Sequence, residues 1–352
     1  MPTSRYSVGV IGLNIGGHHI AGYRRQGVRV AAICDMSPER LADCARRFGI
    51  ERAYTSAAEL IADPEVDIVD IAIQPQHRWP VVAKASSAGK PIFIQKPLAM
   101  SLRQAVGMVE LCERRGVPLM VNHNSCFVPG FLAVEPYLRP EYLGDIYAVS
   151  IQNWGLYLTF PERHIIPAMM IHHLALLHKW FGRFETVYCQ AHGHTRTIEE
   201  GEVAATAQFR HESGVQSLVV DNWALLERAP RGPGHPHEEL RIQGTRGSIC
   251  GHSEALTVYV TEPRPVEIRP AFEGTWFPDG FGLGMRHFQE CLATGATPVT
   301  DGRGNLHVLQ AVFAAYESAR ENRVVAIEEI ALDGDWDLSP EPVLEPDPAD
   351  MA

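Results

Sequence analysis

A glycine-rich turn between an apolar strand and a helix constrains this chain more than any other feature. The turn lies in the run Val8-Gly9-Val10-Ile11-Gly12-Leu13-Asn14-Ile15-Gly16-Gly17, and Asp35 ends the strand that follows. In such a strand–turn–helix unit, Gly12 permits a tight turn, and Gly17 is the small residue at which the helix packs on the strand. The pattern therefore predicts a dinucleotide-binding unit near the N-terminus.

The residues around this turn favour NAD as the cofactor. We expect Asn14 and Ile15 of the turn to contact the cofactor, while the N-terminus of the following helix would offer N–H groups and the positive end of its dipole to the pyrophosphate. Asp35 would accept hydrogen bonds from both ribose hydroxyls and repel a 2′-phosphate, whereas Arg40 would attract one, which keeps NADP as the alternative. Asn14 stands at the middle glycine position, where asparagine tolerates unusual backbone angles better than most residues. A plain glycine turn without a nucleotide is the simpler alternative.

The first third of the chain alternates short apolar strands with amphipathic helical stretches. The predicted strands are 7–12, 28–35, 66–73, 91–94 and 118–121. The predicted helices between them are 17–26, 38–48, 57–62, 78–88 and 102–115. Continuous apolar strands that alternate with helices predict a parallel sheet covered on both faces, as in a Rossmann domain.

After residue 121 the pattern changes to longer strands in which polar and apolar residues alternate. The predicted strands here are 145–155, 184–197, 202–211, 214–225, 238–244, 247–251 and 256–262, and the predicted helices are 167–181, 284–294 and 305–321. This pattern predicts an α+β domain on a large, mostly antiparallel open sheet. A chain of 352 residues also exceeds what one hydrophobic core usually organises.

We therefore expect three parts in this chain. Residues 1–122 form the NAD-binding domain, residues 123–330 form a substrate and oligomerisation domain, and residues 331–352 form a loose surface tail. Helix 305–321 is a candidate to pack back on the first domain.

Composition excludes several classes of protein. The net charge of −11 argues against a nucleic-acid-binding surface, and no apolar run is long enough for a membrane span. The N-terminus lacks the apolar region of a signal peptide. Seven cysteines with wide spacing and no C-x-x-C pair are typical of a reduced, cytoplasmic protein.

Two further sequence runs, Ile73-Gln74-Pro75-Gln76-His77 and Gln95-Lys96-Pro97, lie where predicted parallel strands end. This is the carboxyl edge of the sheet, where ligands bind in open α/β sheets. We expect cofactor contacts from the residues of these runs, Gln74, Pro75, His77, Gln95 and Lys96. Near a cationic nicotinamide and away from bulk water, Lys96 would lose its proton more readily, which suits proton transfer near neutral pH. By itself, a lysine at a strand end is more often a solvated charge.

These features together resemble the Gfo/Idh/MocA oxidoreductases. The resemblance runs from about residue 7 to residue 327 and includes the glycine turn with Asp35 and the run Gln95-Lys96-Pro97. It also includes His172 in a helix that ends Trp180-Phe181-Gly182, and the segment Ala314-Ala315-Tyr316-Glu317-Ser318-Ala319-Arg320. The resemblance implies a Rossmann domain, a second domain with a large open sheet, a sugar or polyol substrate, and oligomerisation through that sheet as a homodimer or homotetramer.

The family also implies roles for single residues. Its motif lysine and its histidine fall on Lys96 and His172, which would act at the carbinol being oxidised. Four family positions hold other residues in this chain: Ala168 and Ala175 stand where aspartates are common, Cys126 stands for an arginine, and Gln95 stands for a glutamate. These departures concern the proton relay and leave the cofactor prediction unchanged.

Two adjacent histidines lie in the predicted helix 167–181, which is apolar nearly all round. Adjacent helical residues point about 100° apart, so only one of them can face a given ligand. We expect His172 to be catalytic and His173 to be structural or to orient the substrate, while two hydrogen-bonded core histidines are the simpler alternative. His164 is a weaker candidate. Because these histidines lack a compact ligand spacing, we predict no metal site.

The predicted reaction is reversible hydride transfer between a sugar or polyol carbinol and NAD. The expected substrate contacts are Asn124, Asn153, Trp154, Arg163, His172 and His173. Two other functions stay open: a non-catalytic NAD-binding regulator, which the alanines at 168 and 175 favour, and NAD-assisted glycoside modification or cleavage through a keto-sugar. Net turnover of the cofactor distinguishes the three.

Overall fold

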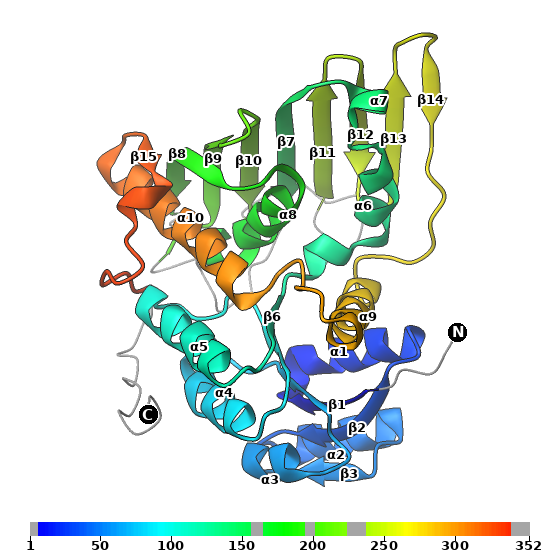
Figure 1. Cartoon of the computed structure of the whole chain (residues 1–352), viewed down its shortest axis with the longest axis vertical. Helices are drawn as coiled ribbons and strands as arrows, with labels where there is room; N and C mark the ends of the chain where they lie inside the picture. The colour runs from blue at the N-terminus through cyan, green and yellow to red at the C-terminus, as the bar shows by residue number, and fades with distance from the viewer. Residues whose placement is uncertain (1–5, 156–164, 194–200, 224–236, 339–352) are drawn as a thin grey trace. The chain divides into compact units, whose positions relative to one another are not determined.

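The computed structural model describes residues 6–155, 165–193, 201–223 and 237–338. The chain divides into two compact units (Figure 1). The first unit contains 1–127, 276–306 and 332–352, and the second contains 128–275 and 307–331.

This division differs from the predicted one chiefly in residues 276–306, which join the first unit. The physical reason is a close approach of two helices, α1 (Leu13–Arg25) and α9 (Asp279–Thr294). A Cβ on Gly22 would lie 2.2 Å from the carbonyl oxygen of Pro278, and a Cβ on Gly282 would lie 2.3 Å from that of Gly22. The backbones therefore meet where only glycine fits.

The first unit is built on the predicted Rossmann sheet. Its six strands run parallel in the order β3-β2-β1-β4-β5-β6. The strands are β1 (Ser7–Ile11), β2 (Arg29–Cys34), β3 (Arg52–Tyr54), β4 (Ile68–Ile71), β5 (Ile92–Gln95) and β6 (Leu119–Asn122). All residues of β1 and β4 are buried, as strands covered on both faces must be. Only β3 escaped prediction, because it is three residues long and largely exposed.

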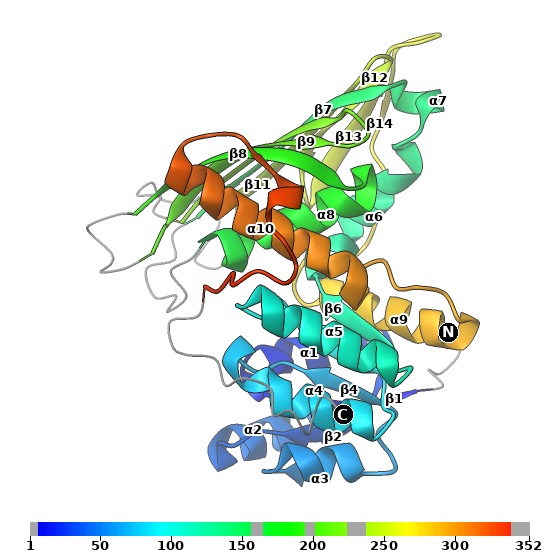
Figure 2. The same ribbon diagram turned by 60° about the vertical axis from the view of Figure 1, so that its left-hand side comes forward.

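Helices cover the two faces of this sheet. They are α2 (Pro38–Phe48), α3 (Ala57–Ala62), α4 (Arg78–Ser87) and α5 (Leu102–Arg114), besides α1 and α9. In Figure 2, α4 and α5 stand in front of the strands. Three helices begin earlier than predicted, α1 at Leu13, α9 at Asp279 and α10 (Gly302–Glu321) at Gly302, because glycines in their first turns weaken the helical pattern of the sequence.

The second unit is built on a nine-stranded sheet in the order β14-β13-β12-β11-β7-β10-β9-β8-β15. The strands are β7 (Ile146–Trp154), β8 (Phe184–His192), β9 (Ala204–His211), β10 (Gln216–Asn222), β11 (His237–Gly244), β12 (Gly247–His252), β13 (Ala255–Val260), β14 (Val266–Ile268) and β15 (Val325–Ala326). Every neighbouring pair is antiparallel except β7 and β10, which confirms the mostly antiparallel expectation. The short strands β14 and β15 were not predicted.

One face of this sheet is buried against helices. Helix α8 (Ile171–Phe181) follows a π-helical turn at Ile166–Met170, and the second-unit part of α10 (Gly302–Glu321) also packs here. Ser318 Oγ of α10 accepts a hydrogen bond of 2.8 Å from the Cys189 N–H of β8. The short helices α6 (Pro129–Val134) and α7 (Pro140–Leu143) complete the unit.

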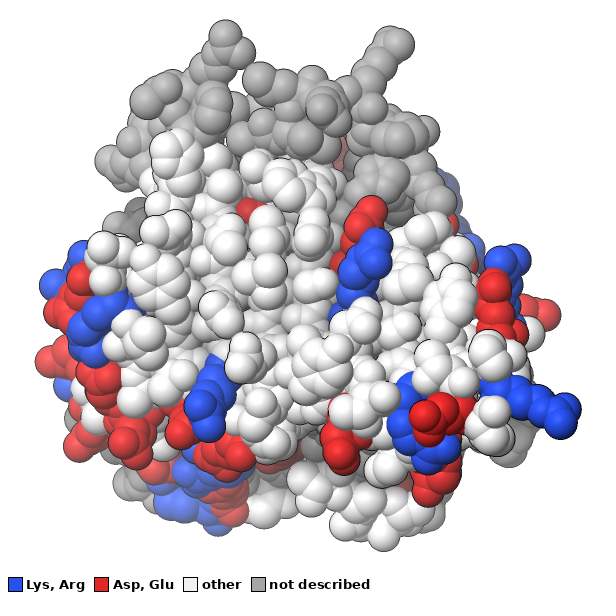
Figure 3. All heavy atoms as spheres, turned by 90° about the horizontal axis from the view of Figure 1, so that it is seen from above, with Lys and Arg blue, Asp and Glu red and all other residues white. Residues whose placement is uncertain are grey.

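The opposite face of the sheet has exposed apolar side chains. Leu218 of β10 is 37% exposed and Tyr259 of β13 is 38% exposed. In the view from above in Figure 3, Lys, Arg, Asp and Glu side chains are sparse across the middle of the visible face.

The expectation of a loose tail is wrong for residues 336–338. The Leu102 N–H donates to the Trp336 carbonyl at 2.9 Å, and the Leu338 N–H donates to the Met100 carbonyl at 3.0 Å. Between these two hydrogen bonds, Ser101 and Asp337 pair as an isolated antiparallel β-bridge. This segment was unpredictable because its pairing partner lies more than 200 residues away in the sequence. Residues 339–352 lie outside the described part.

None of the helices in the described part of the chain combines the length and the apolar composition that a bilayer crossing requires.

Candidate functional site

The predicted tight turn is present at Gly12. Its φ of 89° lies in the region that favours glycine, and its N–H donates to the Cys34 carbonyl at 2.8 Å. A Cβ on Gly12 would lie 2.7 Å from Cγ2 of Ile73 and 2.8 Å from the carbonyl oxygen of Ala72. The turn thus leads directly from β1 into α1 with no room for a side chain.

The glycine that permits close packing of helix and strand is Gly16, so the prediction for Gly17 is wrong. A Cβ on Gly16 would lie 3.0 Å from Cγ1 of Val10, while nothing lies within 4 Å of a Cβ on Gly17. The reason is the earlier start of α1 at Leu13, which sets the helical phase so that residues 13, 16 and 20 face the sheet.

The first turn of α1 suits an anionic ligand. Asn14 is exposed and Ile15 is half-buried. The residue that precedes the helix is Gly12, which supplies no side-chain cap, and the first turn has no acidic side chain. Apart from the Leu13 N–H, which donates to Asp35, the N–H groups of this turn have no side-chain cap, and together with the positive end of the helix dipole they suit phosphate oxygens.

Asp35 is fixed beside this turn by four donors. Its Oδ2 accepts the Leu13 N–H at 2.8 Å and Arg40 Nε at 3.1 Å. Its Oδ1 accepts the Ser37 N–H at 2.8 Å and an Arg40 terminal nitrogen at 2.9 Å. Burial by itself raises the pKa of Asp35, but these hydrogen bonds and the Arg40 charge outweigh it and hold the pKa below its usual value. Asp35 is therefore an anion, with Arg40 as its counter-ion.

The other predicted cofactor residues lie at the ends of β4 and β5. Pro75 and His77 form a 3-10 turn after β4, in which Pro75 is buried and His77 exposed, and Gln74 precedes this turn and is exposed. Gln95 and Lys96 end β5, and both are half-buried. The Lys96 N–H donates to the Gln95 side-chain oxygen at 3.2 Å.

Arg78 is a residue of this region that the sequence analysis missed. It is 2% exposed, and its guanidinium donates to the Ile73 carbonyl at 2.8 Å and to the carbonyls of Gln95 and Pro97. One buried cation thus ties the loop after β4 to the loop that contains Lys96. The only signal in the sequence was a charged residue directly after the polar run at 74–77.

A second buried network that sequence analysis missed lies under α1. Asp70 Oδ2 accepts the Tyr23 hydroxyl at 2.6 Å and lies 2.8 Å from His19 Nδ1, and all three side chains are fully buried. Burial and the Asp70 charge raise the pKa of Tyr23 well above its usual value. The network anchors the helix whose first turn forms the predicted phosphate site.

In the second unit, His172 and His173 lie in the first turn of α8 and are 8% and 0% exposed. The two positions where the family has aspartates are Ala168, in the π-helical turn, and Ala175, in the helix, and both are buried. Lys96 belongs to the first unit and His172 to the second, so their pairing stays a prediction from the resemblance.

His173 lies between two buried carboxylates. Its Nε2 is 2.6 Å from Glu238 Oε1, and its Nδ1 is 3.3 Å from Asp221 Oδ1. Burial lowers the pKa of His173, but the charges and hydrogen bonds of Asp221 and Glu238 outweigh this and raise it to about 10. His173 is therefore an imidazolium at neutral pH, and both of its ring nitrogens are engaged.

The remaining predicted substrate residues are distributed over different surfaces. Asn153 of β7 is fully buried, while Trp154, the next residue of the strand, points to the opposite face and donates to Gln152 at 3.5 Å. Asn124 lies in the first unit, in a buried turn after β6. Arg163, and the weaker candidate His164, lie outside the described residues.

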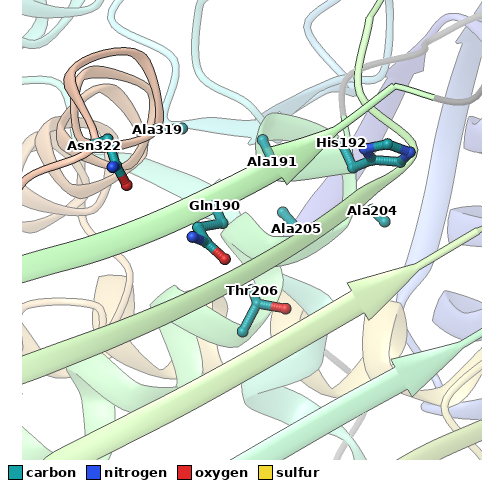
Figure 4. Close-up of a pocket in the computed structure, with 8 residues that line it drawn as sticks. All are labelled: Gln190, Ala191, His192, Ala204, Ala205, Thr206, Ala319 and Asn322. Carbon is teal, nitrogen blue, oxygen red and sulfur yellow. The ribbon is translucent and has the colours of Figure 1, made fainter.

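No group of three or more histidine, cysteine or acidic side chains among the described residues has a geometry suited to a metal ion. A pocket of about 420 Å³ opens in the second unit beside β8 and β9 (Figure 4). None of the predicted site residues lines it: its walls are Gln190, Ala191, His192, Ala204, Ala205, Thr206, Ala319 and Asn322.

Comparison with known proteins identifies both halves of the chain. Residues 6–123 match the model GFO_IDH_MocA, described as an oxidoreductase family with an NAD-binding Rossmann fold. Residues 141–327 match GFO_IDH_MocA_C, the C-terminal alpha/beta domain of the same oxidoreductase family. The two matches together cover most of the chain.

Relatives of known activity extend along nearly the whole chain. A D-apiose dehydrogenase of Paraburkholderia graminis is 32% identical over 331 residues, which cover 89% of this chain and 87% of that protein. A myo-inositol 2-dehydrogenase of Thermotoga maritima is 25% identical and covers 92% of this chain and 99% of its own length.

Solved structures show the same fold. An oxidoreductase from Agrobacterium radiobacter, in complex with NAD+, L-tartaric acid and magnesium, is 28% identical, with a TM-score of 0.84 over 93% of this chain and 100% of that chain. A levoglucosan dehydrogenase in complex with NADH and levoglucosan has a TM-score of 0.81 over 92% of this chain and 99% of that chain, but at 18% identity it shows the fold alone.

Proposed function

The chain belongs to the Gfo/Idh/MocA family of NAD-dependent oxidoreductases and is a dehydrogenase of CH–OH groups, and on that premise we propose that it oxidises a secondary alcohol or lactol of a neutral sugar or polyol. The observation that carries this proposal is Lys96 at the end of β5, in a chain whose second unit has His172 at the family's histidine position. Relatives that act on D-apiose and on inositols support the substrate class.

The residues of the first unit fit NAD. The uncapped first turn of α1 would bind the pyrophosphate, and Asp35 would bind the adenosine ribose, for which Arg40 must give up at least one of its two hydrogen bonds. Gln74, Pro75, His77 and Gln95 would line the nicotinamide end. NAD supplies the hydride acceptor, and the protein supplies position and electrostatics.

The protein's own part in the reaction is to move one proton. Lys96 would take the hydroxyl proton of the carbinol, and bound NAD⁺ would supply the acceptor for its hydride, so that alcohol and NAD⁺ would become ketone or lactone, NADH and one proton. His172 would orient the same hydroxyl. Asn124 and Asn153 are the proposed further substrate contacts, whereas Trp154 points to the opposite face of β7 and is not proposed for this role.

A screen of neutral aldoses, cyclitols and anhydrosugars for NADH absorbance tests this function. We expect at least one to give NADH with the wild-type protein and none with Lys96→Ala. NAD-assisted glycoside cleavage would consume substrate without net NADH, and a regulatory protein would bind NAD without either change. Full turnover by Lys96→Ala would exclude the proposed role of the lysine.

We also propose self-association through the open face of the nine-stranded sheet, as a homodimer or homotetramer. Exposed Leu218 and Tyr259 and the sparsely charged face in Figure 3 support this proposal. Sedimentation of the wild-type protein and of Leu218→Glu tests it, since a buried charge would dissociate the oligomer. The seven free cysteines support a reducing, cytoplasmic location.

A further inference from the structure

Three polar side chains stand in one row across the middle of the nine-stranded sheet. Asn153 of β7 pairs in register with Asp221 of β10 on one side and with Glu238 of β11 on the other. Residues that pair in register point to the same face of a sheet, so these side chains are neighbours. They are 0%, 0% and 2% exposed, and His173 of α8 contacts both carboxylates, so the row lies on the face that α8 covers.

The neighbouring row of the same face is apolar. Two residues further into the sheet, Ile151 pairs with Val219 and with Leu240, and all three are fully buried. A row with a purely structural role would continue this apolar pattern, because buried polar groups lower stability unless each is hydrogen-bonded. The change from apolar to polar at Asn153 therefore calls for a partner.

Only some of the polar side-chain atoms in this row have a hydrogen-bond partner among the described residues. Glu238 Oε1 contacts His173 at 2.6 Å, but Glu238 Oε2 has no hydrogen-bond partner there. Asp221 Oδ1 has only its ion-pair contact of 3.3 Å with His173 Nδ1 and no hydrogen bond. Neither the nitrogen nor the oxygen of the Asn153 side chain has one. One oxygen of each carboxylate and the whole Asn153 amide thus make no hydrogen bond within the described residues.

The charges of the row define the ligand that it would accept. Burial raises the pKa of Glu238, although its contact with His173 opposes this shift, so with His173 protonated the row is neutral or carries one net negative charge. In neither case does it carry the net positive charge that would attract a phosphate or a carboxylate. The unused acceptors match hydroxyl donors, and the Asn153 amide can both donate to and accept from a hydroxyl. A neutral compound with neighbouring hydroxyl groups meets all of these requirements.

We propose that Glu238, Asn153 and Asp221 form a hydroxyl-recognition row that determines which neutral polyol the enzyme oxidises, with His173 holding the two carboxylates in position. This inference rests on the proposed function and deepens it, since it assigns the substrate class to specific side chains. His173 is a positioning residue, because its two ring nitrogens already serve the carboxylates.

Steady-state kinetics with three variants test the row. Glu238→Gln and Asp221→Asn keep the side-chain shape and remove one charged acceptor each, and Asn153→Ser removes the amide. Each should raise the KM for the best polyol about tenfold or more, with a smaller change in kcat, because the carboxylate variants lose a charged hydrogen bond to the substrate and Asn153→Ser loses the amide hydrogen bonds. The matched control is Glu239→Gln, an exposed neighbour on the opposite face of β11, which should leave both constants unchanged.

Analogues of the substrate locate the contacts. If the row binds hydroxyls, a deoxy analogue that lacks the contacted hydroxyl should lose affinity with the wild-type enzyme and lose little more with the matching variant. A uniform fall in kcat for every substrate, with KM unchanged, would overturn the proposal, because it would mean that the cluster only positions α8. Unchanged constants in all three variants would overturn it as well.

A binding measurement separates this inference from the proposed function. Calorimetric titration of neutral polyols into the wild-type enzyme saturated with NADH reports recognition without turnover. If no polyol is oxidised, the proposed function fails, and the row is judged by this titration alone. If a polyol binds equally well to the wild type and to Glu238→Gln and Asp221→Asn, the row is wrong while the function can stand.

Discussion

The two units each present carboxylates beside a cation, but they differ in how far the chain itself satisfies them. Asp35 of the first unit accepts four hydrogen bonds, two of them from Arg40, whose side chain is 55% exposed. Asp221 and Glu238 of the second unit share one buried histidine and keep oxygens without a partner. A ligand at Asp35 must compete with a cation in contact with water, whereas a ligand at the second cluster would complete an unfinished network.

This difference in hydrogen bonding implies that the two units have separate functions. A satisfied, ionised carboxylate beside a helix N-terminus suits a common cofactor that must exchange in every turnover. A partly satisfied buried network discriminates more strongly, because a wrong ligand leaves its polar groups unpaired. Variants in each unit should therefore change different kinetic constants.

The largest effect should come from Lys96. Lys96→Ala removes the proposed proton acceptor and should lower kcat by roughly 10²- to 10⁴-fold, the usual contribution of general base catalysis. NADH affinity, followed by fluorescence titration, should change little. Lys84→Ala, an exposed lysine of α4, is the control and should keep full activity. Equal losses in kcat and NADH affinity would place Lys96 in cofactor binding instead.

The next largest effect should come from Asp35, whose carboxylate already accepts four hydrogen bonds from the chain itself. Asp35→Ala should weaken NAD binding by roughly 10- to 100-fold, as the loss of one or two charge-assisted hydrogen bonds implies. It also releases Arg40, which could then bind a 2′-phosphate, so the ratio of NADP to NAD efficiency should rise. The double variant Asp35→Ala/Arg40→Ala should lose that rise. An unchanged ratio in the single variant would show that Arg40 does not face the ribose.

How far each unit can be predicted from sequence follows from the range of its contacts. Gly12 and Asp35 are predictable because the turn, the helix and the next strand are consecutive in the chain. The His173 cluster is not, because its partners lie 48 and 65 residues away and meet only through the register of three strands. Within α1 the choice between Gly16 and Gly17 depended on the helix start, which glycines conceal.

Substitutions of two glycines of α1 should have a smaller effect, which concerns only the stability of the fold. Gly22→Ala places a methyl group 2.2 Å from the Pro278 carbonyl and should lower the free energy of unfolding by about 1–3 kcal/mol. Gly17→Ala meets nothing within 4 Å and should raise it by up to about 1 kcal/mol, because alanine favours a helix. Urea denaturation without cofactor measures both. Equal effects would contradict the packing of α9 on α1.

The smallest effects concern pH and the histidines of the second unit. Burial lowers the pKa of His211 to about 4 and that of His307 to about 3, whereas the carboxylates raise the pKa of His173 to about 10. Because the unfolded chain binds protons near pH 6.5, His211 and His307 lower stability as the pH falls from 6.5 toward 4. His173 acts in the opposite direction and loses its stabilising effect as the pH rises from 6.5 toward 10.

Urea denaturation of the wild type and of His211→Gln/His307→Gln between pH 6.5 and 5 isolates the first of these effects, because other groups with shifted pKa values, such as His18 and Glu238, contribute alike to both proteins. The wild type should lose stability in this window, and His211→Gln/His307→Gln should lose less. Between pH 7 and 8.5, stability should fall in the wild type and stay nearly level in His173→Gln, which has no imidazolium to deprotonate. Above that range, buried cysteines with raised pKa values, such as Cys112 and Cys189, lower stability in both proteins alike. If that variant shows the same slope as the wild type between pH 7 and 8.5, the two carboxylates do not share a protonated His173.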